Sequence, residues 1–210
     1  PEAVYMLFAL NRIGAVAVEL DPRTNEENVK KIIKASGTKF YITMEDCSLM
    51  IDNLIKNNED LSSQLKNVMF ISPTESLPFG LSLISNIKDQ FERFRGHKPI
   101  VPYSSKCINW SKFIKSGRGY EGKINLEYRP NVVTEIIFSS GTTSTPKPIQ
   151  YTNETFTNMV RQVELGENDY AVGDKNLDII PLYLGFGSNN GLYTVLCFGI
   201  EDILIPVPVT

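Results

Sequence analysis

Helix-like and strand-like patterns alternate along this chain, and that alternation constrains the fold more than any other feature. In the first part of the chain, amphipathic patterns separated by short apolar runs occur in the order 3–13, 15–18, 24–36, 40–42, 47–58 and 68–71. Parallel strands need connections of about the length of a helix, and strands covered on both sides are apolar throughout. We therefore predict an α/β fold with a layered, mostly parallel sheet flanked by helices.

The second half of the sequence continues this alternation. We expect helices at 82–94, 109–116, 152–165 and 190–198, and strands at 132–138 and 177–180. Residues 95–105 contain a glycine and two prolines and are the least regular stretch, so we predict a mobile or boundary segment there. Thr24 and Glu27 have the spacing of a capping box, which predicts that Thr24 caps the second helix.

Composition and charge narrow the classes of function. Hydrophobic residues make up 42% and charged residues 21% of the 210 residues, as in soluble globular proteins. The formal net charge is −3 and no dense basic face appears, so we do not expect nucleic-acid binding. The longest apolar run, 193–208, is interrupted by Glu201 and Asp202 and is shorter than the roughly 20 residues that span a bilayer, so we expect no membrane span.

Cysteine and histidine give no sign of a metal site. Cys47, Cys107 and Cys197 lie far apart and form no CxxC pair, so we expect reduced thiols in or near the core of a cytoplasmic protein. The single histidine, His97, lies in a polar, turn-rich stretch and is interpreted as a solvated loop residue.

The segment Phe138–Lys147 carries the clearest chemical signal. It follows an apolar strand, and six of its ten residues bear hydroxyl groups. Hydroxyls, the backbone amides around Gly141 and the Lys147 ammonium group are suited to bind a polyphosphate. A Walker A loop is excluded because Pro146 and Pro148 replace its second glycine and its Ser/Thr. Composition alone leaves a solvated Ser/Thr loop as an equal alternative.

The order of residues in this segment resembles the phosphate-binding signature of adenylate-forming enzymes, the superfamily of acyl-CoA synthetases, luciferases and peptide-synthetase adenylation domains. Ser144 and Pro148 stand where that signature usually has glycine. The matching residues are Ser139, Ser140, Gly141, Thr142, Thr143, Pro146 and Lys147. The resemblance implies that the ATP-binding residues are Ser139, Ser140, Gly141, Thr142, Thr143, Ser144, Thr145 and Lys147.

Two further stretches resemble the same superfamily, whereas 66–128 does not match residue by residue. Residues 1–23 resemble an upstream segment, and Pro181 opens a stretch that resembles the wall of the acyl pocket. Leu184 replaces a histidine found in many members, which suits an aliphatic or aromatic acid. The substrate-binding residues implied are Tyr183, Leu184, Gly185, Phe186 and Gly187. Without the resemblance, an ordinary core helix is the favoured interpretation of this stretch.

The resemblance implies an ATP-dependent acyl-CoA synthetase that converts a carboxylic acid to an acyl-adenylate and then to a thioester. Lys147 would be the catalytic residue, placed on the β- and γ-phosphates. The cofactors implied are ATP, Mg²⁺, whose main ligand is expected outside this chain, and coenzyme A. The partners implied are a carboxylic acid and the thiol of coenzyme A or of a carrier protein.

The same residues leave other interpretations open. Residues 1–210 are expected to form part of a larger N-terminal AMP-binding domain. The rest of that domain and a C-terminal lid domain are expected to lie outside this chain, and the chain alone is expected to be inactive. One alternative is an amino-acid adenylation domain of a peptide synthetase. Another is a degenerate member that binds ligand without turnover, because Ser144 and Pro148 replace glycines. A third is an α/β scaffold without nucleotide binding.

Overall fold

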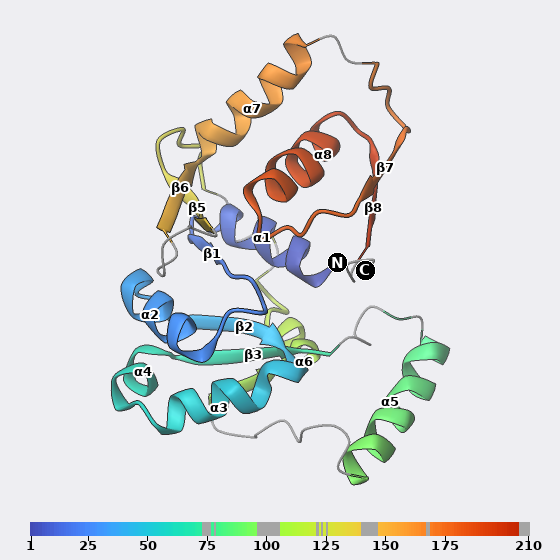
Figure 1. The fold of residues 1–210 in the computed structure, drawn as a ribbon. Helices are drawn as coiled ribbons and strands as arrows, with labels where there is room; N and C mark the ends of the chain where they lie inside the picture. Colours follow the sequence, from blue (N-terminus) through green and yellow to red (C-terminus); the bar gives the residue numbers. More distant parts are fainter. Residues whose placement is uncertain are drawn as a thin grey trace. The chain divides into compact units, whose positions relative to one another are not determined.

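The computed structural model describes residues 1–72, 77, 79–95, 106–120, 122, 124, 126–139, 147–166 and 169–205. The chain divides into two compact units (Figure 1). The split unit comprises Pro1, Ala3–Asp21 and Asn125–Thr210, and the inserted unit comprises Glu2 and Pro22–Ile124. Of the predicted mobile or boundary segment 95–105, residues 96–105, which include His97, lie outside the described residues.

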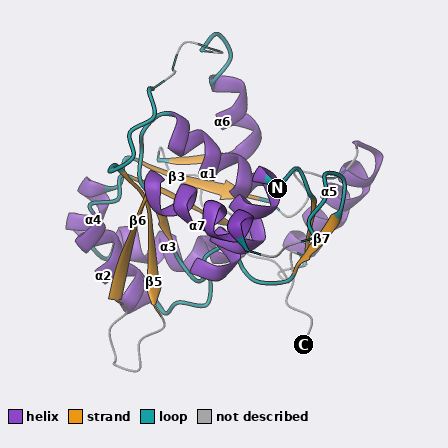
Figure 2. Cartoon of the chain, turned by 90° about the horizontal axis from the view of Figure 1, so that it is seen from above, coloured by secondary structure: helices purple, strands orange, loops and turns teal. Residues whose placement is uncertain are grey.

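The split unit is built on a three-stranded sheet with the order β1-β5-β6 (Figure 1). Its strands β5 and β6 lie side by side (Figure 2). Strand β5 is parallel to β1 and antiparallel to β6, and β7 and β8 form a separate parallel pair. Its elements are α1 (Glu2–Arg12), β1 (Ala17–Glu19), β5 (Val133–Ser139), β6 (Lys147–Thr152), α7 (Asn153–Leu165), β7 (Lys175–Asp178), the π-helical η2 (Gly187–Thr194), α8 (Val195–Cys197) and β8 (Glu201–Leu204).

The inserted unit contains an all-parallel sheet with the order β2-β3-β4. Its central strand is buried along three successive residues, Val68, Met69 and Phe70, as expected for a strand covered on both faces. Its elements are α2 (Glu26–Ser36), β2 (Phe40–Met44), η1 (Glu45–Cys47), α3 (Ser48–Lys56), α4 (Glu59–Gln64), β3 (Asn67–Ile71), α5 (Phe79–Phe94), β4 (Cys107–Asn109) and α6 (Trp110–Ser116).

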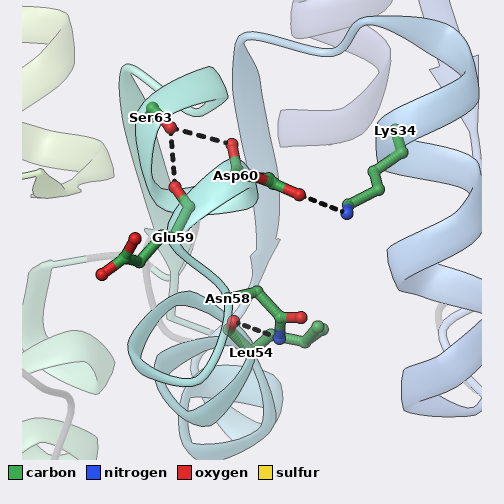
Figure 3. A network of polar contacts seen from close by, with 6 residues as sticks. All are labelled: Lys34, Leu54, Asn58, Glu59, Asp60 and Ser63. Carbon is green, nitrogen blue, oxygen red and sulfur yellow. Dashed lines mark hydrogen bonds and ion pairs between the residues drawn. The ribbon is translucent and has the colours of Figure 1, made fainter.

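Polar contacts fix the short helix α4 beside its neighbours in the inserted unit (Figure 3). Lys34 of α2 donates to Asp60 of α4 at 2.9 Å, and this ion pair lowers the pKa of Asp60. Asn58 donates to the Leu54 carbonyl at 2.9 Å where α3 ends. Leu61 of α4 is completely buried, so the polar contacts hold in register a helix that hydrophobic burial stabilises.

The predicted α/β architecture with mostly parallel strands and flanking helices is confirmed, but several helix starts differ from the prediction: α5 begins at Phe79 rather than 82, and η2 at Gly187 rather than 190. The second helix is capped by Asn25 rather than Thr24: the Asn25 side chain accepts the amide of Asn28 at 3.0 Å. Asn is at least as good an N-cap as Thr. Thr24 is followed three positions later by Glu27, and Asn25 by Asn28, so the sequence pattern did not distinguish the two possible N-caps. Helix α4 and strand β4 were not predicted.

The core of the split unit joins α1, β1 and η2. Leu7, Ala17 and Leu192 form its buried centre. Tyr193 packs its ring on Phe156 of α7, with 4.1 Å between the ring centroids, and on Phe8 of α1, at 5.5 Å. These contacts bring the N-terminal helix and the C-terminal segments together around one apolar centre, which is the typical unit of a folded domain.

Other expectations from composition are met in part. All three cysteines are free, as predicted, but Cys197 is exposed, so its placement in or near the core is wrong. It is the last residue of the short helix α8. No helix in the described part of the chain is long and apolar enough to cross a membrane. The described residues also contain no group of three or more His, Cys, Asp or Glu side chains that is arranged to bind a metal ion.

Candidate functional site

Strands β5 and β6 bring the two ends of the predicted phosphate loop together. They pair antiparallel, and Ser139 and Lys147 are direct partners in the register. Ser139 is half-buried and Lys147 is exposed. Residues 140–146 lie outside the described residues, so the placement of Ser140, Gly141, Thr142, Thr143, Ser144 and Thr145 stays a prediction.

The loop is shorter than the sequence indicated. Between the predicted strand 132–138 and the predicted helix 152–165, the sequence favours a loop from Ser139 to Gln150, but β6 already begins at Lys147. Pro148 lies opposite Phe138 in a strand that borders the described sheet on one side only. Proline removes a donor and is tolerated at such an edge. Pro148 is therefore compatible with its position in β6.

The loop follows the carboxyl end of β5, a strand that is parallel to β1. In open α/β sheets, ligands bind outside the carboxyl ends of the strands. Thr134, Glu135 and Ile137 are buried, which anchors β5 in the sheet up to the loop. Ser139 and Lys147 therefore lie at the edge of the sheet where ligands bind in open α/β folds, and their roles in binding and catalysis stay predictions.

The helix after β6 begins where the sequence predicted, within one residue. Thr152 is the N-cap of α7, and its side chain accepts the Thr155 amide at 3.2 Å. The Thr155 hydroxyl accepts the Thr152 amide in return, also at 3.2 Å, which completes a capping box. This reciprocal pair fixes the turn that joins β6 to α7.

The predicted substrate segment, Tyr183–Gly187, leads into the π-helix η2. Leu184 and Phe186 are exposed, 40% and 62% respectively, whereas Gly187 is buried. The segment contacts the hairpin that carries the phosphate loop: a Cβ added to Gly185 would lie 2.6 Å from the hydroxyl of Tyr151 in β6. The structure thus places the backbone of the predicted substrate segment against β6, the strand that begins at Lys147 of the predicted phosphate loop.

The backbone at Gly187 leaves no room for a side chain. An added Cβ would overlap the carbonyl oxygen of Pro181 and lie 2.8 Å from that of Ile180. Both neighbours are backbone atoms, so the turn itself would have to shift. Gly187→Ala is therefore expected to destabilise the protein by about 1–3 kcal/mol, as measured by urea unfolding. Gly80→Ala is the control because nothing lies within 4 Å of its added Cβ. Equal midpoints for the two variants would contradict the expectation.

A buried polar cluster around Glu135 and Ser188 lies next to the predicted substrate segment, and the sequence analysis did not identify it. Glu135 of β5 has no exposed surface, and the Ser188 hydroxyl lies 3.0 Å and 3.2 Å from its two carboxylate oxygens. Glu19 of β1 lies on the same face of the sheet, since Ala17 pairs with Glu135. The signal that was available is a glutamate, next to Thr134, within the mostly apolar strand 132–138.

The electrostatics of this cluster favour neutral carboxyl groups. The pKa of Glu135 is raised to about 8, mainly by burial and also by the neighbouring Glu19 carboxyl, while the Ser188 hydrogen bond acts against this rise. Burial also raises the pKa of Glu19 to about 7 and is the main cause of the raised pKa of Tyr193. The Asn11 amide acts against the rise at Tyr193 and lowers its pKa. The same amide donates to the Thr134 hydroxyl at 2.8 Å.

Known proteins similar to this chain place these features in context. The sequence pattern of the family described as AMP-binding enzyme matches residues 1–209. The chain is 24% identical over 215 residues to 4-coumarate–CoA ligase 2 of Oryza sativa subsp. japonica, covering 98% of this chain and 32% of the relative. It is 23% identical to 4-coumarate–CoA ligase 1 of Arabidopsis thaliana, with the same coverage. The chain thus spans about a third of these relatives' length.

Solved structures share the fold. The anthranilate CoA ligase AuaEII in complex with anthranoyl-AMP superposes with a TM-score of 0.66 and 16% identity, covering 98% of this chain and 33% of that chain. MbtA of Mycobacterium smegmatis gives a TM-score of 0.68 at 18% identity, covering 99% of this chain and 32% of that chain. The match over residues 1–209 identifies this chain as a member of the AMP-binding enzyme family.

Proposed function

We propose that this chain is the part of an ATP-dependent acid–thiol ligase, an acyl-CoA synthetase, that binds the triphosphate of ATP and the carboxylic acid. One observation carries the proposal: within a chain that belongs to the AMP-binding family, Ser139 and Lys147 pair at the carboxyl edge of β5 and close the hydroxyl-rich loop. The rest of the N-terminal domain and a C-terminal lid domain are proposed to lie in the part of the protein outside residues 1–210.

The proposed reaction begins with attack of a carboxylate oxygen on the α-phosphorus of ATP. The new bond forms the acyl-adenylate, and the bond to the bridging oxygen breaks to release pyrophosphate. Two anions must approach each other, so the site must neutralise charge and hold both groups in place. At about 4 Å and an effective dielectric constant near 20, one ammonium–phosphate pair contributes roughly 4 kcal/mol before desolvation. The exposed Lys147 ammonium group is proposed to supply this charge to the β- and γ-phosphates.

The hydroxyl groups of Ser139, Ser140, Thr142, Thr143, Ser144 and Thr145 are proposed to donate to the same phosphates, with Gly141 supplying backbone freedom. They are neutral, so they release pyrophosphate more readily than a cage of cations would. A thiol, from coenzyme A or from a carrier protein, then attacks the acyl carbon and displaces AMP. The Mg²⁺ that accompanies ATP is proposed to find its main protein ligand outside this chain.

The acid is proposed to bind along Tyr183, Leu184, Gly185, Phe186 and Gly187. Leu184 and Phe186 present apolar side chains at the surface of this unit, and apolar walls with few polar groups suit an aliphatic or aromatic acid. The names of the curated relatives, which are 4-coumarate–CoA ligases, support an aromatic acid as the first substrate to try.

The experiment that tests the function is acid-dependent exchange of radiolabelled pyrophosphate into ATP by the full-length protein. The panel contains 4-coumarate, benzoate, octanoate and phenylalanine. Exchange with one of the first three acids and subsequent formation of its coenzyme A thioester is the expected result. Exchange with phenylalanine alone would support the amino-acid adenylation alternative, and no exchange with any acid would overturn the proposal.

A second candidate is a degenerate member that binds ligand without turnover. The observation that favours it is the replacement of two family glycines by Ser144 and Pro148. Pro148, however, lies in β6 at a position where a proline is tolerated. Restoring both glycines distinguishes the two candidates: a large gain in pyrophosphate exchange would favour degeneracy, and unchanged exchange would favour an active enzyme that tolerates these residues.

A further inference from the structure

The buried carboxyl group of Glu135 is not required by the fold of a β-strand. At its place in β5, an apolar residue would be buried without cost, whereas an ionised carboxylate without a cation partner is expensive to bury. Its only hydrogen-bond donor among the described residues is Ser188. A buried polar group in such a position needs a structural or functional explanation.

Ser188 links Glu135 to the predicted substrate segment. Its hydroxyl donates to Glu135 at 3.0 Å, and its backbone amide donates to the carbonyl of Leu184 at 2.9 Å. The next residue, Asn189, donates from its side chain to the Gly185 carbonyl at 2.8 Å. Two successive residues of η2 therefore hold two successive residues of the substrate segment, and Glu135 anchors the first of them to the sheet.

The element that carries Ser188 is itself unusual. Residues Gly187–Thr194 form a π-helix, a rare conformation that occurs frequently at functional sites. Glycines allow its close packing, with Gly187 against the Pro181 carbonyl and Gly191 against the Asp178 carboxylate. Ser188, which forms the hydrogen bond to Glu135, is the second residue of this π-helix. The bond therefore sets the position of the start of the helix relative to β5.

We propose that Glu135 is a positioning residue: through Ser188 it fixes the substrate segment Tyr183–Gly187 relative to β5, the strand that ends at the phosphate loop. The inference rests on the proposed function, since it assigns Glu135 a role in binding the acid rather than ATP. The inference concerns a residue outside the phosphate loop, because Glu135 is completely buried and would contact neither ATP nor the acid.

The titratable groups that act on Glu135 explain how this anchor responds to pH. They are Glu19, from β1, and Tyr193, from η2. A protonated Glu135 keeps an oxygen that accepts the Ser188 hydroxyl without a buried charge. Ionisation of both glutamates places two negative charges on one face of the sheet, so the anchor is expected to weaken as the pH rises above about 8.

The test compares KM values for the acid and for ATP in pyrophosphate exchange by the full-length protein, with the most active acid of the panel. Ser188→Ala and Glu135→Leu are expected to raise the KM for the acid about tenfold, the loss typical of one buried hydrogen bond, and to leave the KM for ATP within about twofold. Glu135→Gln keeps an acceptor for Ser188, so it is expected to retain the wild-type KM at pH 7 and to hold it above pH 8.

Thr134→Val is the matched control. It removes a different buried hydroxyl, on β5, that accepts from Asn11 of α1 at 2.8 Å. If Ser188→Ala changes the KM for the acid no more than Thr134→Val does, at equal melting temperatures, the positioning role is overturned. Ser188→Ala carries the test if Glu135→Leu does not fold. A wild-type protein without exchange overturns the proposed function and the inference together, whereas an active wild type with unaffected variants overturns the inference alone.

Discussion

Lys147→Ala in the full-length protein is expected to lower acid-dependent pyrophosphate exchange by about 100-fold or more. The side chain is exposed at the mouth of the loop, paired through its backbone with Ser139, so the substitution leaves the core intact. The substitution removes the ammonium charge that is proposed to reduce the repulsion between the carboxylate and the phosphates of ATP as they approach each other. The measurement is the rate of exchange at saturating acid and ATP, for wild type and variant side by side.

Lys175→Ala provides the control for this prediction. Lys175 also begins a strand of the split unit, is exposed, and forms an ion pair with Glu201 at 3.3 Å. Loss of such a surface pair has a small effect on stability, and we expect exchange within about twofold of wild type. A Lys147→Ala variant that exchanges pyrophosphate as fast as Lys175→Ala would remove the catalytic role from Lys147.

The stability of the split unit is expected to fall as the pH rises from about 5 to 8. The pKa of Glu135 in the folded protein is about 8, above its ordinary value of 4.5, and that of Glu19 is about 7. Between these limits the folded state binds more protons than the unfolded state, so stability decreases with pH, by at most about 1.4 kcal/mol per pH unit for each group. Below pH 4.5 both states are protonated and the effect vanishes.

Glu135→Gln removes one of these two contributions. Relative to wild type, the variant is expected to gain about 2 kcal/mol between pH 6 and pH 8, because glutamine has no proton to lose. The measurement is urea unfolding of the 210-residue chain at both pH values, followed by amide hydrogen exchange in peptides that cover β5 and η2. Glu154→Gln, an exposed glutamate of the same unit, is the control. A wild-type unfolding free energy that is independent of pH over this range would contradict the prediction.

Local patterns predicted the elements well but their edges poorly. Thr152 was a recognisable start of α7, since its capping group and its partner Thr155 are neighbours in sequence. The start of α2 was not, because Thr24 and Asn25 both have a partner three residues on and only the folded chain shows that Asn25 caps the helix. Strand β6 was missed because Pro148 is compatible with a strand only at a sheet edge, and edge position is a property of the assembled sheet.

The sequence by itself determined the α/β class, the order of most elements and the composition of the phosphate loop, because periodicity and short motifs are encoded within a few residues of each other. Only the tertiary structure decided that Ser139 and Lys147 face each other across a hairpin, that Gly185 packs on Tyr151, and that Glu135 meets Ser188. Glu135 and Ser188 are 53 residues apart, and the burial that raises the pKa of the carboxyl group exists only once β5 is covered by η2. Contacts of that range depend on how the elements pack, which no local pattern specifies.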